Sequence, residues 1–161
     1  MANTIIYVQE NGFDTQKDLK SRILSERGKL SETQNRMDEL KADMNSLNEQ
    51  IHFTGQYLSN KRIYAEFLKS NNKKLFRREH AEQIQSYEEA RSKLNEFYPD
   101  GNILPLKNLK EQKAELQKQM VELKAELKYH KNCCKELEIA DANVSVILDT
   151  KIPEKQKSYE L

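Results

Sequence analysis

Residues 109–148 read LKEQKAELQKQMVELKAELKYHKNCCKELEIADANVSVIL. Side chains that suit a helix interface recur here at alternating spacings of three and four residues, and most of the others are charged or carry amides. This C-terminal ladder consists of Leu109, Lys113, Leu116, Met120, Leu123, Leu127, His130, Cys134, Leu137, Asp141, Val144 and Leu148. A repeat of about 3.5 residues over five heptads predicts a helix that packs along its length on a partner helix.

An N-terminal ladder with the same spacing precedes it. Its positions are Leu19, Ile23, Glu26, Leu30, Thr33, Met37, Leu40, Met44, Leu47, Ile51, Thr54 and Leu58. About fifty residues separate the two ladders, so the two helices can fold back on each other as an antiparallel hairpin within one chain. A parallel homodimer through each ladder is the alternative, and we favour the hairpin because contacts within one chain avoid the entropy cost of association.

The predicted fold is all-α: a long antiparallel helical hairpin (coiled coil), a small helical cap between its two long helices, and a short N-terminal helix. We expect a single helical domain over 1–155. Its predicted parts are a short helix at 3–11 that ends at Gly12, a long helix at 15–58 with Asp14 as N-cap, a cap at 60–98, a long helix at 105–149 that Pro153 ends, and a polar tail at 150–161.

Aromatic residues concentrate in the segment between the ladders. The stretch from Ile63 to Leu68 predicts one short helix, Asn71-Asn72 predicts a turn, and Pro99-Asp100-Gly101 is a strong turn signal. A second cap helix is predicted from its apolar positions, which are Ala81, Ile84, Tyr87, Ala90 or Arg91, Leu94 and Phe97. The polar interruptions of the ladders are the positions where register or a partner could be chosen, namely Glu26, Thr33, Lys113, His130 and Asp141.

Composition indicates a thin core rather than a globular one, because 37% of the residues are hydrophobic and 33% are charged. The formal net charge of +1 indicates neither a nucleic-acid-binding protein nor an acidic tail. No apolar run is as long as a membrane span and no signal peptide is recognisable, so we expect a cytoplasmic protein without membrane contact. We expect the adjacent Cys133 and Cys134 to be reduced.

The sequence lacks the motifs of enzymes, so we expect no catalytic residue, no metal and no cofactor. The three histidines are far apart, no glycine-rich phosphate loop is present, and no serine or cysteine lies in a nucleophile elbow. His130, Cys133 and Cys134 could supply three soft ligands on neighbouring turns. The favoured interpretation is that Cys134 and His130 are helix-interface residues.

One local cluster of positive charge stands out, and it is a possible contact for nucleic acid or a partner. It consists of Lys69, Lys73, Lys74, Arg77 and Arg78, with Phe76 among them. Clustered cations bind phosphates, and an aromatic side chain can stack on an unpaired base. The alternative is that Phe76 anchors the cap to the long helices.

The middle of the chain resembles the C-terminal helical (coiled-coil) region of relaxases, the mobilisation nucleases of conjugative plasmids and integrative elements. The residues that carry this resemblance are Lys61-Arg62-Ile63-Tyr64-Ala65-Glu66-Phe67 and Phe76-Arg77-Arg78-Glu79-His80-Ala81-Glu82-Gln83-Ile84. Residues 4–12 are similar to the short helix before the coiled region there, and Leu104-Pro105 to the start of its last long helix.

This resemblance implies a non-catalytic module. The nicking chemistry of the family belongs to a domain with a histidine-rich metal site and a catalytic tyrosine, and no segment of this chain matches either. The expected role is to position the relaxase in the DNA-processing complex through contacts with protein partners of the conjugation machinery. The alternatives are a DNA-contacting accessory domain that uses the basic cluster and a structural coiled-coil spacer.

Overall fold

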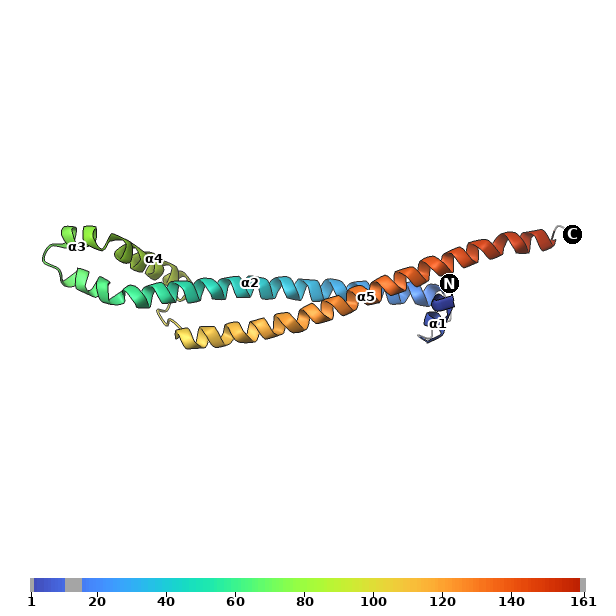
Figure 1. Ribbon diagram of the computed structural model, residues 1–161, viewed down its shortest axis with the longest axis horizontal. Helices are drawn as coiled ribbons and strands as arrows, with labels where there is room; N and C mark the ends of the chain where they lie inside the picture. Colours follow the sequence, from blue (N-terminus) through green and yellow to red (C-terminus); the bar gives the residue numbers. More distant parts are fainter. Residues whose placement is uncertain (1, 11–15, 160–161) are drawn as a thin grey trace. The chain divides into compact units, whose positions relative to one another are not determined.

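The computed structural model describes residues 2–10 and 16–159, and within these ranges the chain forms helices and turns without a strand (Figure 1). The helices are α1 (Ala2–Glu10), α2 (Gln16–Lys69), α3 (Lys73–Glu79), α4 (Ala81–Phe97) and α5 (Leu106–Tyr159). The prediction of an all-α fold is confirmed. The predicted caps of the first two helices, Gly12 and Asp14, lie outside the described residues.

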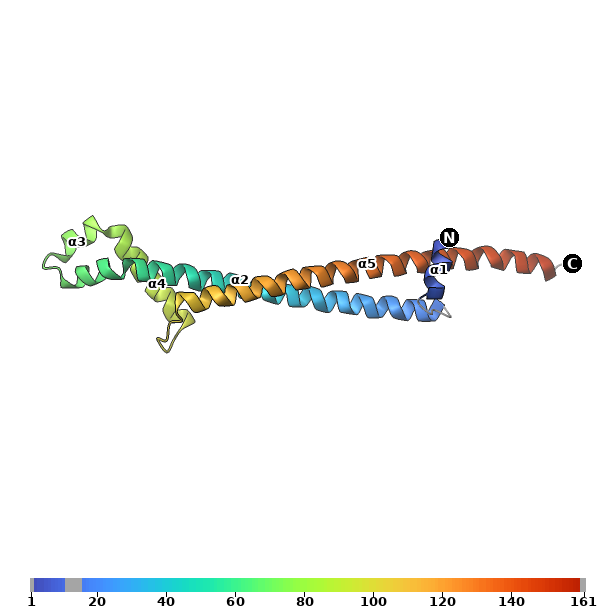
Figure 2. The same ribbon diagram turned by 60° about the horizontal axis from the view of Figure 1, so that its bottom comes forward.

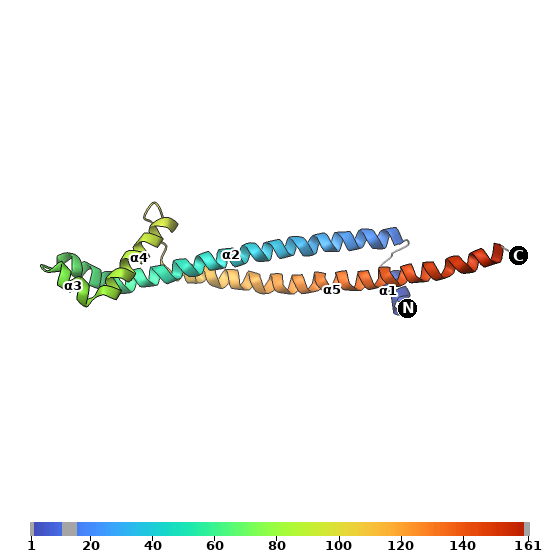
Figure 3. The same ribbon diagram turned by 90° about the horizontal axis from the view of Figure 1, so that it is seen from above.

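The chain divides into two compact units, and both long helices contribute to each of them. Unit 1 comprises Met1–Asp38 and Val121–Leu161, and unit 2 comprises Glu39–Met120. In each unit α2 and α5 lie side by side and run in opposite directions, as the hairpin prediction requires (Figures 1 and 3). The single domain predicted for 1–155 stays a prediction.

In unit 1 most ladder positions face the partner helix; the prediction is wrong for Leu148, which is 44% exposed because α2 begins at Gln16, opposite Ser145. Leu19, Ile23, Leu137 and Ala140 form a buried cluster, and further along the same seam Met37, Leu123 and Leu127 are buried. Cross-helix contacts show the antiparallel register, because Gln16 bonds to Ser145 whereas Arg36 pairs with Glu126. The 3.5-residue spacing therefore has the structural meaning predicted for it: it marks the seam between the two helices.

Helix α1 belongs to unit 1 and lies across the paired helices there (Figure 2). Tyr7 packs against the Leu19 cluster, and the buried Thr4 accepts a 2.7 Å hydrogen bond from Nδ2 of Asn143. The helix predicted at 3–11 is thus present, with described bounds of Ala2–Glu10.

Unit 2 adds α3 and α4 to the two long helices. Helix α4 buries Ile84, Tyr87, Ala90 and Leu94. Of the two alternatives for the packed position, Ala90 and Arg91, the structure shows Ala90, because Arg91 is exposed. After α4 the predicted turn is present: Gly101 has φ +76°, and its N–H donates to the carbonyl of Tyr98 at 2.9 Å. The hydroxyl of Tyr98 donates to Oε1 of Gln50 on α2 at 2.6 Å, which ties this turn to the long helix.

The first long helix ends later in the chain than predicted. Helix α2 continues past residue 58 to Lys69, so the segment from Ile63 to Leu68 is its last part and not a separate short helix. The physical reason is that nothing breaks the helix before Ser70: no proline occurs in α2, and each of its two glycines, Gly28 and Gly55, costs only about 1 kcal/mol. The predicted turn at Asn71-Asn72 is confirmed.

Helix α3 was not predicted. It begins after Asn72, whose side chain accepts a 3.1 Å hydrogen bond from the backbone N–H of Leu75. This is the ordinary role of an asparagine N-cap. Five of the six residues predicted as a possible contact therefore lie on α3, and Lys69 lies at the end of α2.

Helix α5 begins at Leu106, one residue later than predicted, and continues to Tyr159. The prediction that Pro153 ends it, with a polar tail from 150, is wrong for the backbone. A proline removes one backbone hydrogen bond, and the residues that follow it, Glu154, Lys155, Gln156 and Lys157, are good helix formers.

Candidate functional site

The end of α2, together with α3 and α4, brings five aromatic residues of unit 2 into one packed group: Tyr57, Tyr64, Phe67, Phe76 and Tyr87. Tyr64 and Tyr87 stack with ring centroids 4.1 Å apart, and Tyr57 also stacks on Tyr87, with a centroid distance of 5.0 Å. Burial and a hydrogen bond with Tyr57 raise the pKa of Tyr87 to about 12, so the Tyr87 hydroxyl keeps its proton at physiological pH. These rings hold α4 on α2.

Phe76 belongs to the same packing. It is half-buried, with its ring centroid 4.4 Å from that of His80 and 6.3 Å from that of Phe67 on α2. The structure thus agrees with the alternative interpretation of Phe76 as an anchor between α3 and α2. A ring held in this way is not free to stack on an unpaired base.

Arg77 is the second residue of the cluster with an internal role. Its guanidinium makes hydrogen bonds of 2.8 and 3.3 Å to the two carboxylate oxygens of Glu88 on α4. Its Cζ atom lies 4.9 Å from the centroid of Phe67. The hydrogen bonds with Glu88 raise the pKa of Arg77 above its usual range. Arg77 therefore clamps α3 to α4, although its side chain stays 51% exposed.

The remaining predicted cations are free for contact. Lys69, Lys73, Lys74 and Arg78 are exposed and make no ion pair with the residues that the structure describes. Two leucines beside them are also solvent-exposed, Leu68 at 55% and Leu75 at 39%. The six residues predicted as a possible contact are thus of two kinds: Phe76 and Arg77 make contacts within unit 2, and the other four are exposed cations.

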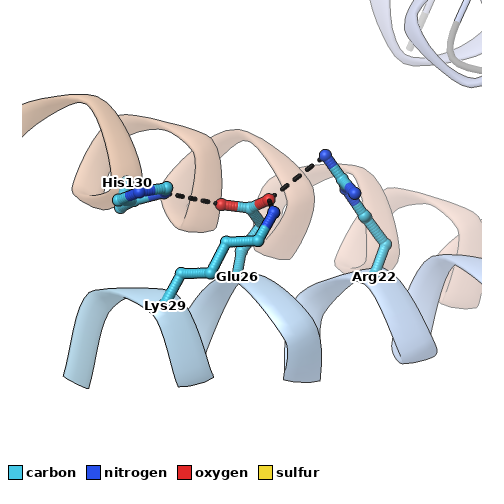
Figure 4. Close-up of polar contacts among 4 residues, drawn as sticks. All are labelled: Arg22, Glu26, Lys29 and His130. Atoms are coloured by element: carbon cyan, nitrogen blue, oxygen red, sulfur yellow. Dashed lines mark hydrogen bonds and ion pairs between the residues drawn. The ribbon is translucent and has the colours of Figure 1, made fainter. Parts of the chain in front are cut away.

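A second polar centre lies in the seam of unit 1, where Glu26 is only 2% exposed (Figure 4). Nδ1 of His130 lies 2.9 Å from Oε2 of Glu26, and the other carboxylate oxygen is 3.0 Å from Nζ of Lys29 and 3.1 Å from Arg22. Since a carboxylate only accepts hydrogen bonds, His130 donates through Nδ1. Two predicted interruptions, one from each ladder, therefore meet and satisfy each other.

The environment of Glu26 keeps its carboxylate charged. Burial acts to raise the pKa, but the hydrogen bonds from His130 and Lys29 and the charges of Lys29 and Arg22 outweigh it, so the pKa lies below its ordinary value. Sequence reasoning identified both positions but missed their pairing. The signal was present in the antiparallel register, which brings one polar ladder position opposite another.

The two neighbouring cysteines differ in their exposure. Cys133 is half-buried and Cys134 is buried in the seam, and burial raises the pKa of the Cys134 thiol. In residues 2–10 and 16–159 no group of three His, Cys, Asp or Glu side chains is arranged to hold a metal ion. In the same ranges, none of the helices has the length and apolarity needed to cross a membrane.

An open groove runs between α2 and α5 in unit 2, with a volume of about 400 Å³. It is lined by Asp43, Ser46, Leu47, Gln50, Gln112, Glu115 and Leu116. Its carboxylates and amides lie beside two leucines of the seam.

No family model matches the chain, and neither a curated protein nor a solved structure does.

Proposed function

We propose that this chain is a non-catalytic helical interaction module that presents the end of α2 and α3 to a protein partner. One observation supports the proposal most directly: the aromatic residues and Arg77 are engaged inside unit 2, while Lys69, Lys73, Lys74 and Arg78 remain exposed beside Leu68 and Leu75. Exposed apolar side chains among cations are typical of a protein-docking surface.

The resemblance of the cap segment to relaxases suggests where the partner belongs. We propose that the module positions a relaxase in the cytoplasmic DNA-processing complex of conjugative transfer. Its partners would then be proteins of the conjugation machinery, such as the coupling protein of the secretion channel or the accessory proteins that bind the transfer origin.

A pull-down tests this proposal. The full chain, immobilised through a tag, is incubated with the purified coupling protein and accessory proteins encoded on the same genetic element. Retention of one of them at moderate salt is the expected result. If none is retained at micromolar concentration, the proposed role in conjugation fails.

A DNA-contacting role is the second candidate, and the four exposed cations favour it. The matching test is the triple variant K73E/K74E/R78E, in which Arg77 is left in place because it clamps α3 to α4. Loss of single-stranded DNA binding at low ionic strength, with partner binding intact, would support the DNA role. A structural spacer, the third possibility, predicts that neither ligand binds.

A further inference from the structure

The packed face of α2 changes within unit 2, and this leaves a second face of the helix exposed. Tyr57 and Tyr64 contact Tyr87 on α4, and Phe67 contacts Phe76 on α3, as their ring contacts show. The residues that follow each of them in the sequence, Leu58, Ala65 and Leu68, are exposed. Successive residues of a helix differ by about 100°, so these three lie on the flank of the packed face.

Together with Lys61 these residues form a regular stripe, here called the α2 stripe: Leu58, Lys61, Ala65 and Leu68. Their spacing of three, four and three residues is that of a coiled-coil seam. Leu58 is 52% and Leu68 55% exposed, so no described part of the chain covers the stripe. Ten residues of helix extend about 15 Å, which is sufficient for about three turns of a second helix.

Positive charge surrounds the α2 stripe. Lys61 lies in it, Lys69 follows it, and Lys73, Lys74 and Arg78 continue on α3 beside the exposed Leu75. None of these five cations makes an ion pair with the residues that the structure describes, whereas the neighbouring Arg62 is paired with Glu66 at 3.2 Å. The surface therefore carries an excess of positive charge, since Glu66 and Glu79 are the acidic residues of this stretch.

We propose that the α2 stripe docks an acidic amphipathic helix of a partner protein, a refinement that rests on the interaction role proposed above. The leucines receive the apolar side chains of that helix, and its flanking glutamates or aspartates meet the cations, as in the e and g positions of a coiled coil. Nucleic acid would use the cations but leave the leucines in water. A second copy of this chain would bring cations against cations if the two stripes paired.

The test uses the full chain and a designed fluorescent peptide. The peptide is about three heptads long, with leucine at a and d and glutamate at e and g. A scrambled peptide of the same composition and a single-stranded oligothymidine are the comparison ligands. Anisotropy titrations at low and moderate salt are expected to show binding of the designed peptide with a Kd on the order of 100 μM or tighter, weakened by salt.

Two variants separate the contributions. L58Q/L68Q should weaken peptide binding at least tenfold while circular dichroism stays unchanged, because glutamine is as good a helix former as leucine. K61E/K69E/K73E/K74E should weaken it as well and remove its salt dependence. The matched controls are L24Q, at a leucine of α2 in unit 1 that is 68% exposed, and K107E/K110E/K118E on α5. Both controls should bind like the wild type.

Several results would overturn the proposal. They are an absence of peptide binding, equal binding of the scrambled peptide, unchanged binding by L58Q/L68Q, and self-association of the wild type that L58Q/L68Q abolishes. The surface would instead be assigned to nucleic acid if oligothymidine displaces the peptide and binds L58Q/L68Q with the same affinity as the wild type.

This assay and the pull-down fail independently. A coupling protein retained equally by the wild type and L58Q/L68Q would refute the α2 stripe and leave the conjugation role standing. If the peptide binds but no conjugation protein is retained, the α2 stripe is supported and the conjugation role fails.

Discussion

Glu26 shows how a charged residue can occupy a helix seam. A buried carboxylate is costly unless it is paired and hydrogen-bonded, and Glu26 has three partners, Arg22, Lys29 and His130. Only His130 comes from the opposite helix. An offset of α2 against α5 by one turn would leave the carboxylate facing apolar side chains, so this pair favours one register of the two helices.

The pH dependence of stability should reveal this pairing. Because the pKa of Glu26 is lower in the folded state, the carboxylate contributes stability above its unfolded pKa of about 4.3, and this contribution is lost as the pH falls through the folded value. E26Q should lower the free energy of unfolding by about 1–3 kcal/mol at neutral pH and by much less near pH 3. Urea unfolding at both pH values measures the difference.

The control for this change is E138Q. Glu138 pairs with Arg27 at 2.7 Å, but both side chains are about half exposed, and such surface pairs contribute about 0–1 kcal/mol. Equal stabilities of E26Q and wild type at neutral pH would contradict the role assigned to Glu26.

At the scale of single residues the sequence predicted positions better than partners. It identified Glu26 and His130 as ladder positions, but their pairing depends on how the roughly fifty intervening residues return the chain to α5. Phe76 and Arg77 were grouped with the lysines by their closeness in sequence. What distinguishes them from the lysines is their contacts with Phe67 and Glu88. These contacts join different helices, so the spacing of residues along the sequence does not predict them.

At the scale of elements, α2 carries two glycines within one continuous helix. A Cβ atom added at Gly28 or Gly55 would meet nothing within 4 Å, and neither residue has a positive φ. These glycines therefore add backbone entropy to the unfolded chain without serving the packing of the described residues.

Replacing these glycines should stabilise the protein. We expect G28A and G55A each to raise the free energy of unfolding by about 1 kcal/mol, measured by chemical denaturation. G101A is the opposite control: its φ of +76° disfavours any side chain, so it should destabilise by about 1 kcal/mol. If G55A destabilises, α2 is less regular at this point than described.

The end of α2 shows what a periodicity can miss. Leu58 continues the 3.5-residue spacing of the N-terminal ladder, yet it is exposed, whereas Tyr57 contacts α4. The packed face moves by one residue between Thr54 and Tyr57 because the partner in this region includes α4. The spacing is compatible with a packed face that contains Leu58 and with one that contains Tyr57. The sequence therefore could not show that Leu58 lies outside the seam.

At the scale of the molecule, the ladders are covered from within the same chain. Leu19, Ile23 and Met37 of α2, and Leu123, Leu127 and Leu137 of α5, are buried without a second copy. We therefore expect a monomer at micromolar concentration in sedimentation equilibrium. A mass that corresponds only to a dimer would favour the homodimer arrangement.

Charge placed in the seam should disrupt each unit. Leu123 is buried in unit 1 and Leu40 is half-buried in unit 2, so L123D and L40D each put an unpaired carboxylate against apolar neighbours. We expect a loss of several kcal/mol, larger for L123D, and a large fall in helical circular dichroism for the double variant. Retained helicity would show that the ladders are not the scaffold. Leu24→Asp, on an exposed position, is the matched control.

The neighbouring thiols of unit 1 give the molecule an internal reporter of its own motion. Cys134 is buried in the seam and Cys133 is half-buried, so a maleimide can reach Cys134 only when the helices separate locally. Alkylation of a C133S variant, followed by mass spectrometry, should be much slower than that of C134S and should accelerate in E26Q. The alkylation rate of Cys134 then reports how often the two helices separate locally in solution, and no added label is needed.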